Sequence, residues 1–97
     1  MQIEREEYGM VSKELKVTNE AGIHARPAAA VVETCGQFQS HITFTKDDVQ
    51  ANAKSIMNIM LLAAEFGAMI LVEAEGPDEV AALEAVEQLF EDRFRQE

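Results

Sequence analysis

Residues 55–75 read SIMNIMLLAAEFGAMILVEAE, a stretch in which a helix pattern is followed by a strand pattern. Residues 56–65 are apolar on nearly every side and follow Ser55, a residue type favoured at helix N-termini. Gly67 interrupts the run, as glycine commonly does just beyond a helix end. Residues 68–75 then alternate as a half-buried strand does, with Ile70, Val72 and Ala74 on one face. A helix followed directly by a strand predicts a fold that mixes both elements.

The chain on either side of this stretch adds three strands and two helices. Alternation of apolar and polar residues predicts the strands, and apolar spacing of three and four predicts the helices. The expected strands are residues 11–17, 38–45 and 49–51, and the expected helices are residues 25–35 and 79–94. The resulting order, βαββαβα, predicts an α+β two-layer β-sandwich with three helices on one face of a four-stranded, mainly antiparallel sheet.

The composition describes one compact domain with a short N-terminal extension. The chain has 97 residues, of which 47% are hydrophobic and 27% charged, which is enough for one core. Residues 1–10 mix charges without periodicity and are expected to form a loose extension, tethered by Tyr8 or Met10. Residues 11–97 are expected to form the domain.

Charge and cysteine content exclude several classes of function. The net charge of −10 opposes binding to nucleic acid or to an anionic membrane. No apolar run is long enough to span a membrane, and the N-terminus lacks a signal-peptide pattern, so we expect a cytoplasmic protein. Cys35 is expected to be a small buried residue and His41 an exposed strand residue. Since these two and His24 lack metal-ligand spacing, no metal site is expected.

A histidine stands at the expected start of the first helix, within the segment GIHARPA. The unpaired backbone N–H groups there, including that of Ala25, favour an anion near His24. Arg26 adds a forked cationic donor, Gly22 permits a close backbone approach, and Pro27 fixes the direction of the first turn. These features suit a histidine that is phosphorylated. From the residues alone, His24 as a plain capping or solvent-exposed residue and Arg26 as a solvated charge remain alternatives.

The segments GIHARPAA and NAKSIMNIMLLAA, with the strand and helix that follow, resemble the HPr family. Its members are phosphocarriers of the bacterial phosphoenolpyruvate-dependent sugar phosphotransferase system. The resemblance covers about residues 11–94 and implies an open-faced β-sandwich. It implies that His24 is phosphorylated at Nδ1 and that Arg26 neutralises the phosphoryl group. It also implies a monomer without a cofactor, which takes the group from Enzyme I, passes it to Enzyme IIA-type domains in sugar uptake, and turns over no free substrate.

The branch of the family stays open, and one loop residue departs from the family's pattern. Residues 71–90 are at least as similar to a nitrogen-related branch as to the sugar-specific one, so a regulatory phosphoprotein that controls partner proteins is an alternative. Ala21 stands where many members carry a polar residue that helps to hold the phosphoryl group, so backbone donors are expected to take a larger share here.

The segment around Ser55 carries two further expectations. Ser55 suits a helix N-cap, and the matching serine in some family members is phosphorylated by an HPr kinase/phosphorylase, so both roles stay open. Ile56, Met57 and Met60 form one stripe of the helix that a two-layer fold leaves exposed. With Lys54, they are expected to form the partner-docking face near His24, while Ile59 and Leu62 lie on the other side.

Overall fold

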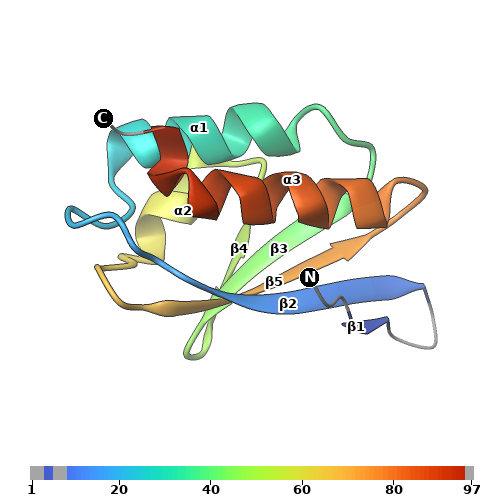
Figure 1. The fold of residues 1–97 in the computed structure, drawn as a ribbon, viewed down its shortest axis with the longest axis horizontal. Helices are drawn as coiled ribbons and strands as arrows, with labels where there is room; N and C mark the ends of the chain where they lie inside the picture. Colours follow the sequence, from blue (N-terminus) through green and yellow to red (C-terminus); the bar gives the residue numbers. More distant parts are fainter. Residues whose placement is uncertain (1–3, 6–8, 96–97) are drawn as a thin grey trace.

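The computed structural model describes residues 4–5 and 9–95, and it contains one sheet covered by helices (Figure 1). Its helical and extended segments follow the predicted order, with one short strand added at the start. The strands are β1 (Glu4–Arg5), β2 (Met10–Lys16), β3 (His41–Lys46), β4 (Val49–Asn52) and β5 (Met69–Glu75). The helices are α1 (Ala25–Cys35), α2 (Ile56–Leu61) and α3 (Glu79–Glu91), and a 3-10 turn, η1 (Arg93–Arg95), follows α3.

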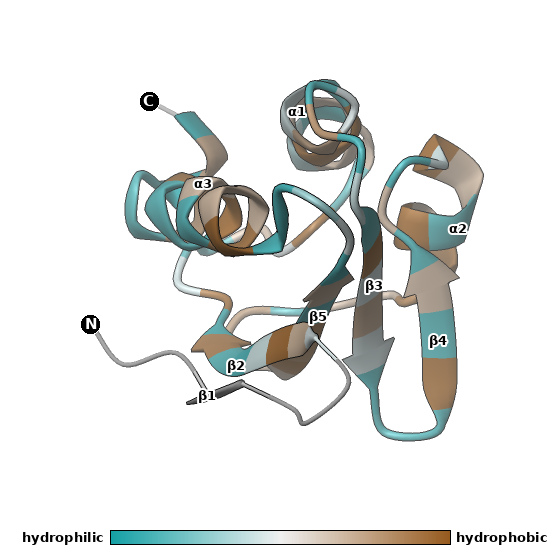
Figure 2. Cartoon of the chain, turned by 90° about the vertical axis from the view of Figure 1, so that its right-hand side faces the viewer, coloured by the Kyte–Doolittle hydropathy of each residue, from teal (hydrophilic) through white to brown (hydrophobic). Residues whose placement is uncertain are grey.

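The strand order in the sheet is β1-β2-β5-β3-β4, and every neighbouring pair is antiparallel. Figure 2 shows the three helices on the same side of the sheet, with α2 next to β4. The predicted fold class is therefore confirmed for the four main strands.

The N-terminal extension contributes the additional strand. Glu4 pairs with Ser12 and Arg5 with Val11, and β2 itself begins at Met10. A short segment that pairs with the outer edge of β2 satisfies backbone groups that an open edge would leave exposed. The expected contact of Tyr8 lies outside the described residues. A domain boundary at residue 10 stays a prediction.

The core lies between the helices and the inner face of the sheet. Alternate strand residues are buried, which confirms the predicted inward faces; they include Val11, Leu15, Ile42, Phe44, Ile70, Val72 and Ala74. Aromatic rings continue this layer into the helices, since the Phe44 and Phe90 ring centroids lie 5.8 Å apart. The centroids of Phe90 and Phe94 lie 4.7 Å apart. The sheet and the C-terminus therefore share one core.

The last helix is shorter than the sequence predicted. α3 ends at Glu91 rather than near residue 94. Arg93, Phe94 and Arg95 all have positive φ, between 53° and 60°, so the chain turns with the opposite hand. This turn returns the buried Phe94 ring to the core, where η1 contacts α1. Burial of that ring compensates for a backbone conformation that side chains disfavour.

The strand predicted from residue 38 begins only at His41, because the preceding residues bind Asp78. The Asp78 carboxylate accepts hydrogen bonds from the Gln39 N–H at 2.9 Å, the Ser40 N–H at 2.9 Å and the Ser40 hydroxyl at 2.5 Å. These bonds, that of the Ser40 hydroxyl first, hold the pKa of Asp78 below its ordinary value. The contact joins the start of β3 to the start of α3.

Replacing Asp78 should therefore change how stability depends on pH. A carboxyl group with a lowered pKa in the folded state stabilises that state above the unfolded pKa, and this contribution is lost as pH falls through the folded pKa. We expect Asp78→Ala to lower Tm at pH 7, and the difference from the unmodified protein to shrink below about pH 4. Thermal unfolding between pH 2 and 7 measures this. Glu84→Ala, an exposed change on α3, serves as the control, and a pH-independent difference for Asp78→Ala would contradict the prediction.

Candidate functional site

His24 occupies the N-cap position of α1, and its imidazole is exposed. Its backbone is extended, with φ −109° and ψ −159°, and its side chain makes no capping hydrogen bond. Its carbonyl oxygen accepts from the Ala28 N–H at 2.8 Å, which is the first hydrogen bond of the helix. Among the described residues the ring therefore caps no backbone N–H group, so the alternative of a histidine side chain that caps the helix is wrong, while that of a solvent-exposed histidine stays open.

The start of α1 also presents donors to the same region. Among the described residues, the N–H groups of Ala25 and Arg26 have no acceptor, and Pro27 carries no N–H. The Arg26 side chain is exposed and makes no ion pair within residues 9–95. Pro27 is buried under the first turn, so the open donors belong to the two residues that follow His24. Such a helix start attracts an anion.

A tight turn precedes His24 and fixes where the loop approaches α1. The Asn19 side-chain amide donates to the Gly22 carbonyl oxygen at 2.6 Å, and the Gly22 N–H donates to the Asn19 carbonyl oxygen at 3.1 Å. Asn19 is buried, and the sequence analysis did not single it out. The sequence signal for this turn was an asparagine three residues before a glycine, in the loop after the first predicted strand. Asparagine side chains commonly bond to the backbone of turns.

The loop then rests on the segment that follows α2. The Ile23 N–H donates to the Ala64 carbonyl oxygen at 2.8 Å. Gly22 has φ +74°, and a Cβ added there would lie 2.6 Å from the Ala64 oxygen and 3.0 Å from the Glu65 Cα. Only glycine fits this approach. The close approach predicted for Gly22 is thus made to this segment of the chain.

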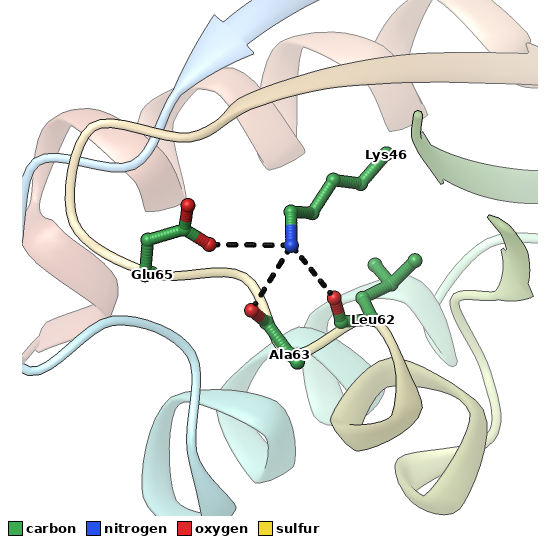
Figure 3. A network of polar contacts seen from close by, with 4 residues as sticks. All are labelled: Lys46, Leu62, Ala63 and Glu65. Carbon is green, nitrogen blue, oxygen red and sulfur yellow. Dashed lines mark hydrogen bonds and ion pairs between the residues drawn. The ribbon is translucent and has the colours of Figure 1, made fainter. Parts of the chain in front are cut away.

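α2 ends four residues earlier than predicted, at Leu61 instead of residue 65. Ala63 has φ +50°, so the chain reverses there. Figure 3 shows the Lys46 ammonium donating to the carbonyl oxygens of Leu62 at 3.3 Å and Ala63 at 3.2 Å, and pairing with the Glu65 carboxylate at 3.2 Å. Lys46 thus satisfies carbonyl groups that the end of the helix leaves unpaired. The sequence analysis missed this role because Lys46 lies on another element.

The carboxyl group of Glu65 responds to this arrangement. A hydrogen bond from its own backbone N–H and then the Lys46 ammonium hold the pKa of Glu65 below its ordinary value. The ion pair is open to solvent on the Glu65 side, where 69% of the side chain is exposed. It therefore adds less to stability than the two carbonyl contacts made by the better buried Lys46.

Ser55 is the N-cap of α2, as predicted. Its hydroxyl accepts from the Asn58 N–H at 3.3 Å and from the Asn58 side-chain amide at 3.2 Å. The Lys54 ammonium donates to the Phe38 carbonyl oxygen at 2.7 Å, so this side chain is anchored to the body of the domain. That anchoring was not anticipated for a docking residue.

The apolar residues of α2 divide as the sequence predicted. Ile59 and Leu62 are buried, while Ile56, Met57 and Met60 are exposed, Met57 at 72%. Leu61 is equally exposed and enlarges the patch. α2 packs against α1, the helix that begins after His24. We call Ile56, Met57, Met60 and Leu61 the α2 patch.

Cys35 is buried, and burial raises the pKa of its thiol to about 12. It is the inert core residue that the sequence predicted. His41 is exposed on β3, as expected. Within the described residues, no group of three or more His, Cys, Asp or Glu side chains could hold a metal ion. No helix in that part of the chain is both long enough and apolar enough to cross a bilayer.

Known proteins share both this sequence and this fold. Residues 11–92 match the family model described as the PTS HPr component phosphorylation site. The phosphocarrier protein HPr of Treponema pallidum (strain Nichols) is 49% identical over 88 residues, which are 91% of this chain and 100% of that protein. The crystal structure of an HPr from Thermoanaerobacter tengcongensis superposes with a TM-score of 0.84 at 42% identity, covering 89% of this chain and 97% of that one. The HPr-like protein Crh of Halalkalibacterium halodurans is 44% identical over 77 residues, 79% of this chain and 92% of that protein.

The family match and the names of these relatives identify the chain as a small phosphocarrier protein and not a catalytic enzyme. The chain belongs to the HPr family of the phosphotransferase system.

The positive φ of Ala63, just beyond the end of α2, can be tested by mutation. Ala63 adopts a left-handed conformation that disfavours any residue with a Cβ, by about 1–2 kcal/mol. Glycine removes this strain but makes the unfolded chain more flexible, which costs about 0.5–1 kcal/mol. We expect Ala63→Gly to raise the free energy of unfolding by about 0.5–1 kcal/mol, the difference between these two effects.

Urea unfolding of this variant provides the measurement. The matched control is Ala29→Gly, an exposed position inside α1, which should lower the free energy of unfolding by about 1 kcal/mol. If both glycine variants lose stability equally, the positive φ at Ala63 does not strain the folded protein.

Proposed function

We propose that His24 is the residue of this phosphocarrier that carries the phosphoryl group. The observation that carries the proposal is the free, exposed imidazole at the start of a helix whose first N–H groups have no acceptor among the described residues. Gly22 and Pro27 support the site by shaping the backbone on either side of the ring. A negatively charged group on His24 is favoured there by the helix dipole and by Arg26.

The transfer step forms one bond as it breaks another. An imidazole nitrogen of His24, Nδ1 by the family resemblance, attacks the phosphorus of a phosphohistidine on the donor. The phosphorus–nitrogen bond of the donor breaks in line, and the donor imidazole keeps the electron pair. Arg26 and the N–H groups of Ala25 and Arg26 stabilise the charge on the equatorial oxygens. In the second transfer, an acceptor histidine attacks the phosphorus on His24, and the His24 imidazole keeps the electron pair of the phosphorus–nitrogen bond that breaks.

The donor in this proposal is Enzyme I, and the acceptors are Enzyme IIA-type domains that serve sugar uptake. A chain with a net charge of −10 repels free phosphate at long range, so delivery by a protein suits it better. The partners exchange the group between histidines, and the carrier itself needs no cofactor. The same partners imply a cytoplasmic monomer.

The α2 patch is the apolar part of the proposed docking face, with Lys54 at its edge. Flexible methionine side chains adapt to more than one partner surface, which suits a carrier that meets both a donor and several acceptors. Because Ile59 and Leu62 form the buried side of the helix, the α2 patch stays exposed and can contact a partner protein. The anchored Lys54 ammonium contributes less to docking than an extended lysine.

A regulatory role is the second candidate, and two observations favour it. The relative named HPr-like protein Crh shows that the sequence is also similar to a protein distinguished from HPr by name. Ser55 caps α2 beside the exposed Ile56 and Met57, where an HPr kinase/phosphorylase would modify it. A phosphoserine is tolerated at a helix start, but it adds about two negative charges to the docking face. Such a change would weaken binding of acidic partners.

Phosphorylation by Enzyme I and phosphoenolpyruvate tests the assignment of His24. Intact mass spectrometry should show one acid-labile phosphoryl group on the unmodified protein and none on His24→Ala. The control is His41→Ala, which removes the other histidine, an exposed residue of β3, and should be modified normally. Arg26→Met should slow the transfer roughly 10²-fold. Full phosphorylation of His24→Ala would contradict the proposal.

The acceptor then separates the two roles. Rapid transfer from the phosphorylated carrier to a sugar-specific Enzyme IIA supports transport, whereas transfer only to a nitrogen-type acceptor supports regulation.

The docking face is tested by the double variant Met57→Ser and Met60→Ser. Both side chains are exposed, so the free energy of unfolding should stay nearly unchanged while Kd for Enzyme I rises about tenfold or more. Titration calorimetry and urea unfolding measure the two quantities. Val49→Ser removes an exposed apolar side chain from β4 and should leave Kd unaffected. A large loss of stability in the double variant would show that the methionines belong to the core.

A further inference from the structure

We propose that Lys46 is a positioning residue for His24: its ammonium group holds the segment after α2, and the loop that ends at His24 rests on that segment. The proposal rests on the assignment of His24 as the phosphorylated residue. It adds a residue from the far end of β3 whose ammonium contacts Leu62, Ala63 and Glu65 and not the imidazole.

The first step of the argument is the anchor. Lys46 is the last residue of β3 and pairs with Val49 across the hairpin, so its backbone belongs to the sheet. Its side chain is 21% exposed and reaches the carbonyl oxygens of Leu62 and Ala63 as well as the Glu65 carboxylate (Figure 3). The Lys46 ammonium thus contacts three of the four residues 62–65. A sheet-borne cation that contacts the end of a helix also interacts favourably with the helix dipole.

The second step is the contact between residues 62–65 and the loop before His24. The Ala64 carbonyl oxygen accepts from the Ile23 N–H at 2.8 Å, and Gly22 fits against Ala64 and Glu65 without room for a Cβ. The same two chain segments are joined again further along. There the Val17 N–H donates to the Ala68 carbonyl oxygen at 2.9 Å, and the Gly67 N–H donates to the Val17 carbonyl oxygen at 2.8 Å. A displacement of Ala64 therefore moves Ile23, and His24 is the next residue.

The third step is the conformation that residues 62–65 would otherwise adopt. These residues have good helix propensity, and the sequence pattern predicts that the helix continues to residue 65. The structure instead ends α2 at Leu61 and places Ala63 at φ +50°. A longer helix would direct the Ala64 carbonyl along the helix axis and away from Ile23. Lys46 opposes this by bonding the Leu62 and Ala63 carbonyl oxygens in the observed turn.

The experiment compares three variants of the full chain. Lys46→Met keeps the length of the side chain and removes its charge and donors, while Lys46→Arg restores both. The matched control is Lys13→Met, which removes another partly buried lysine whose ammonium pairs with the Glu87 carboxylate at 2.6 Å, between β2 and α3. The two Met variants therefore both lose an ion pair, but only one of them loses contact with residues 62–65.

Two quantities are measured for each variant. One is the rate of phosphoryl transfer from phosphorylated Enzyme I at saturating concentration, with the half-saturation concentration determined separately. The other is the hydrogen-exchange rate of the Ile23 amide, followed by NMR in the absence of any partner. Lys46→Met should lower the saturated rate about tenfold with little change in the half-saturation concentration, and should speed Ile23 exchange by a similar factor relative to core amides of β5. Lys46→Arg should recover most of both.

Lys13→Met should leave both quantities near their original values even where Tm falls. The proposal is overturned if Lys46→Met loses stability like Lys13→Met but keeps the rate of transfer or the protection of the Ile23 amide. If the unmodified chain takes no phosphoryl group on His24, the proposed function fails. Ile23 exchange and the NMR signals of the His24 ring in Lys46→Met then decide whether Lys46 positions that residue.

Discussion

The hydrogen bond from the Ile23 amide to the Ala64 carbonyl oxygen joins the two parts of the molecule on which its chemistry depends. One partner immediately precedes His24, and the other, Ala64, lies in the segment after α2, the helix that carries the α2 patch and ends at Leu61. The bond requires unusual backbone on both sides, with φ +74° at Gly22 and +50° at Ala63. The position of His24 and the end of α2 therefore depend on the same contact.

Electrostatics at the site are a local exception to an acidic molecule. The net charge is −10, yet Arg26 is exposed and carries no ion pair within residues 9–95. Three lysines have structural partners instead: Lys13 binds Glu87, Lys46 binds the end of α2, and Lys54 binds the Phe38 carbonyl oxygen. Arg26 and the N–H groups of Ala25 and Arg26 are thus the donors next to His24 that have no acceptor among the described residues. The excess of carboxylates opposes the approach of free anions, whereas the phosphoryl group proposed for His24 would lie beside Arg26 and the N–H groups, where screening is weakest.

The sequence predicted those features that depend on neighbours along the chain. Alternation in β2 and β5 placed Leu15, Ile70 and Val72 in the core, and the Ser55 cap followed from residue type alone. The errors lie where distant residues decide the local structure. α2 stops early because Lys46 reaches it from β3, and β3 starts late because Asp78 binds the residues before it. α3 ends early because the Phe94 ring packs against the Phe90 ring. Local periodicity contains no information about such partners, which is why the contacts that support the loop before His24 were missed, while the chemistry assigned to His24 stays a prediction.

The short helix α2 depends on contacts at its two ends. It spans six residues, fewer than an isolated helix needs, and among them only Ile59 is buried. Its stability therefore depends on side chains that bind its ends: the Ser55 hydroxyl at the start and the Lys46 ammonium beyond the last turn. A phosphoryl group on Ser55 would replace the capping hydroxyl with a stronger acceptor at the favourable end of the dipole, so it would hold the helix while changing the charge of its surface. Loss of the Lys46 contact would leave the surface charge of the α2 patch unchanged while loosening the end of the helix that supports Ile23. Under the proposed function, the two ends would thus separate partner choice, set beside the α2 patch, from the placement of the His24 imidazole.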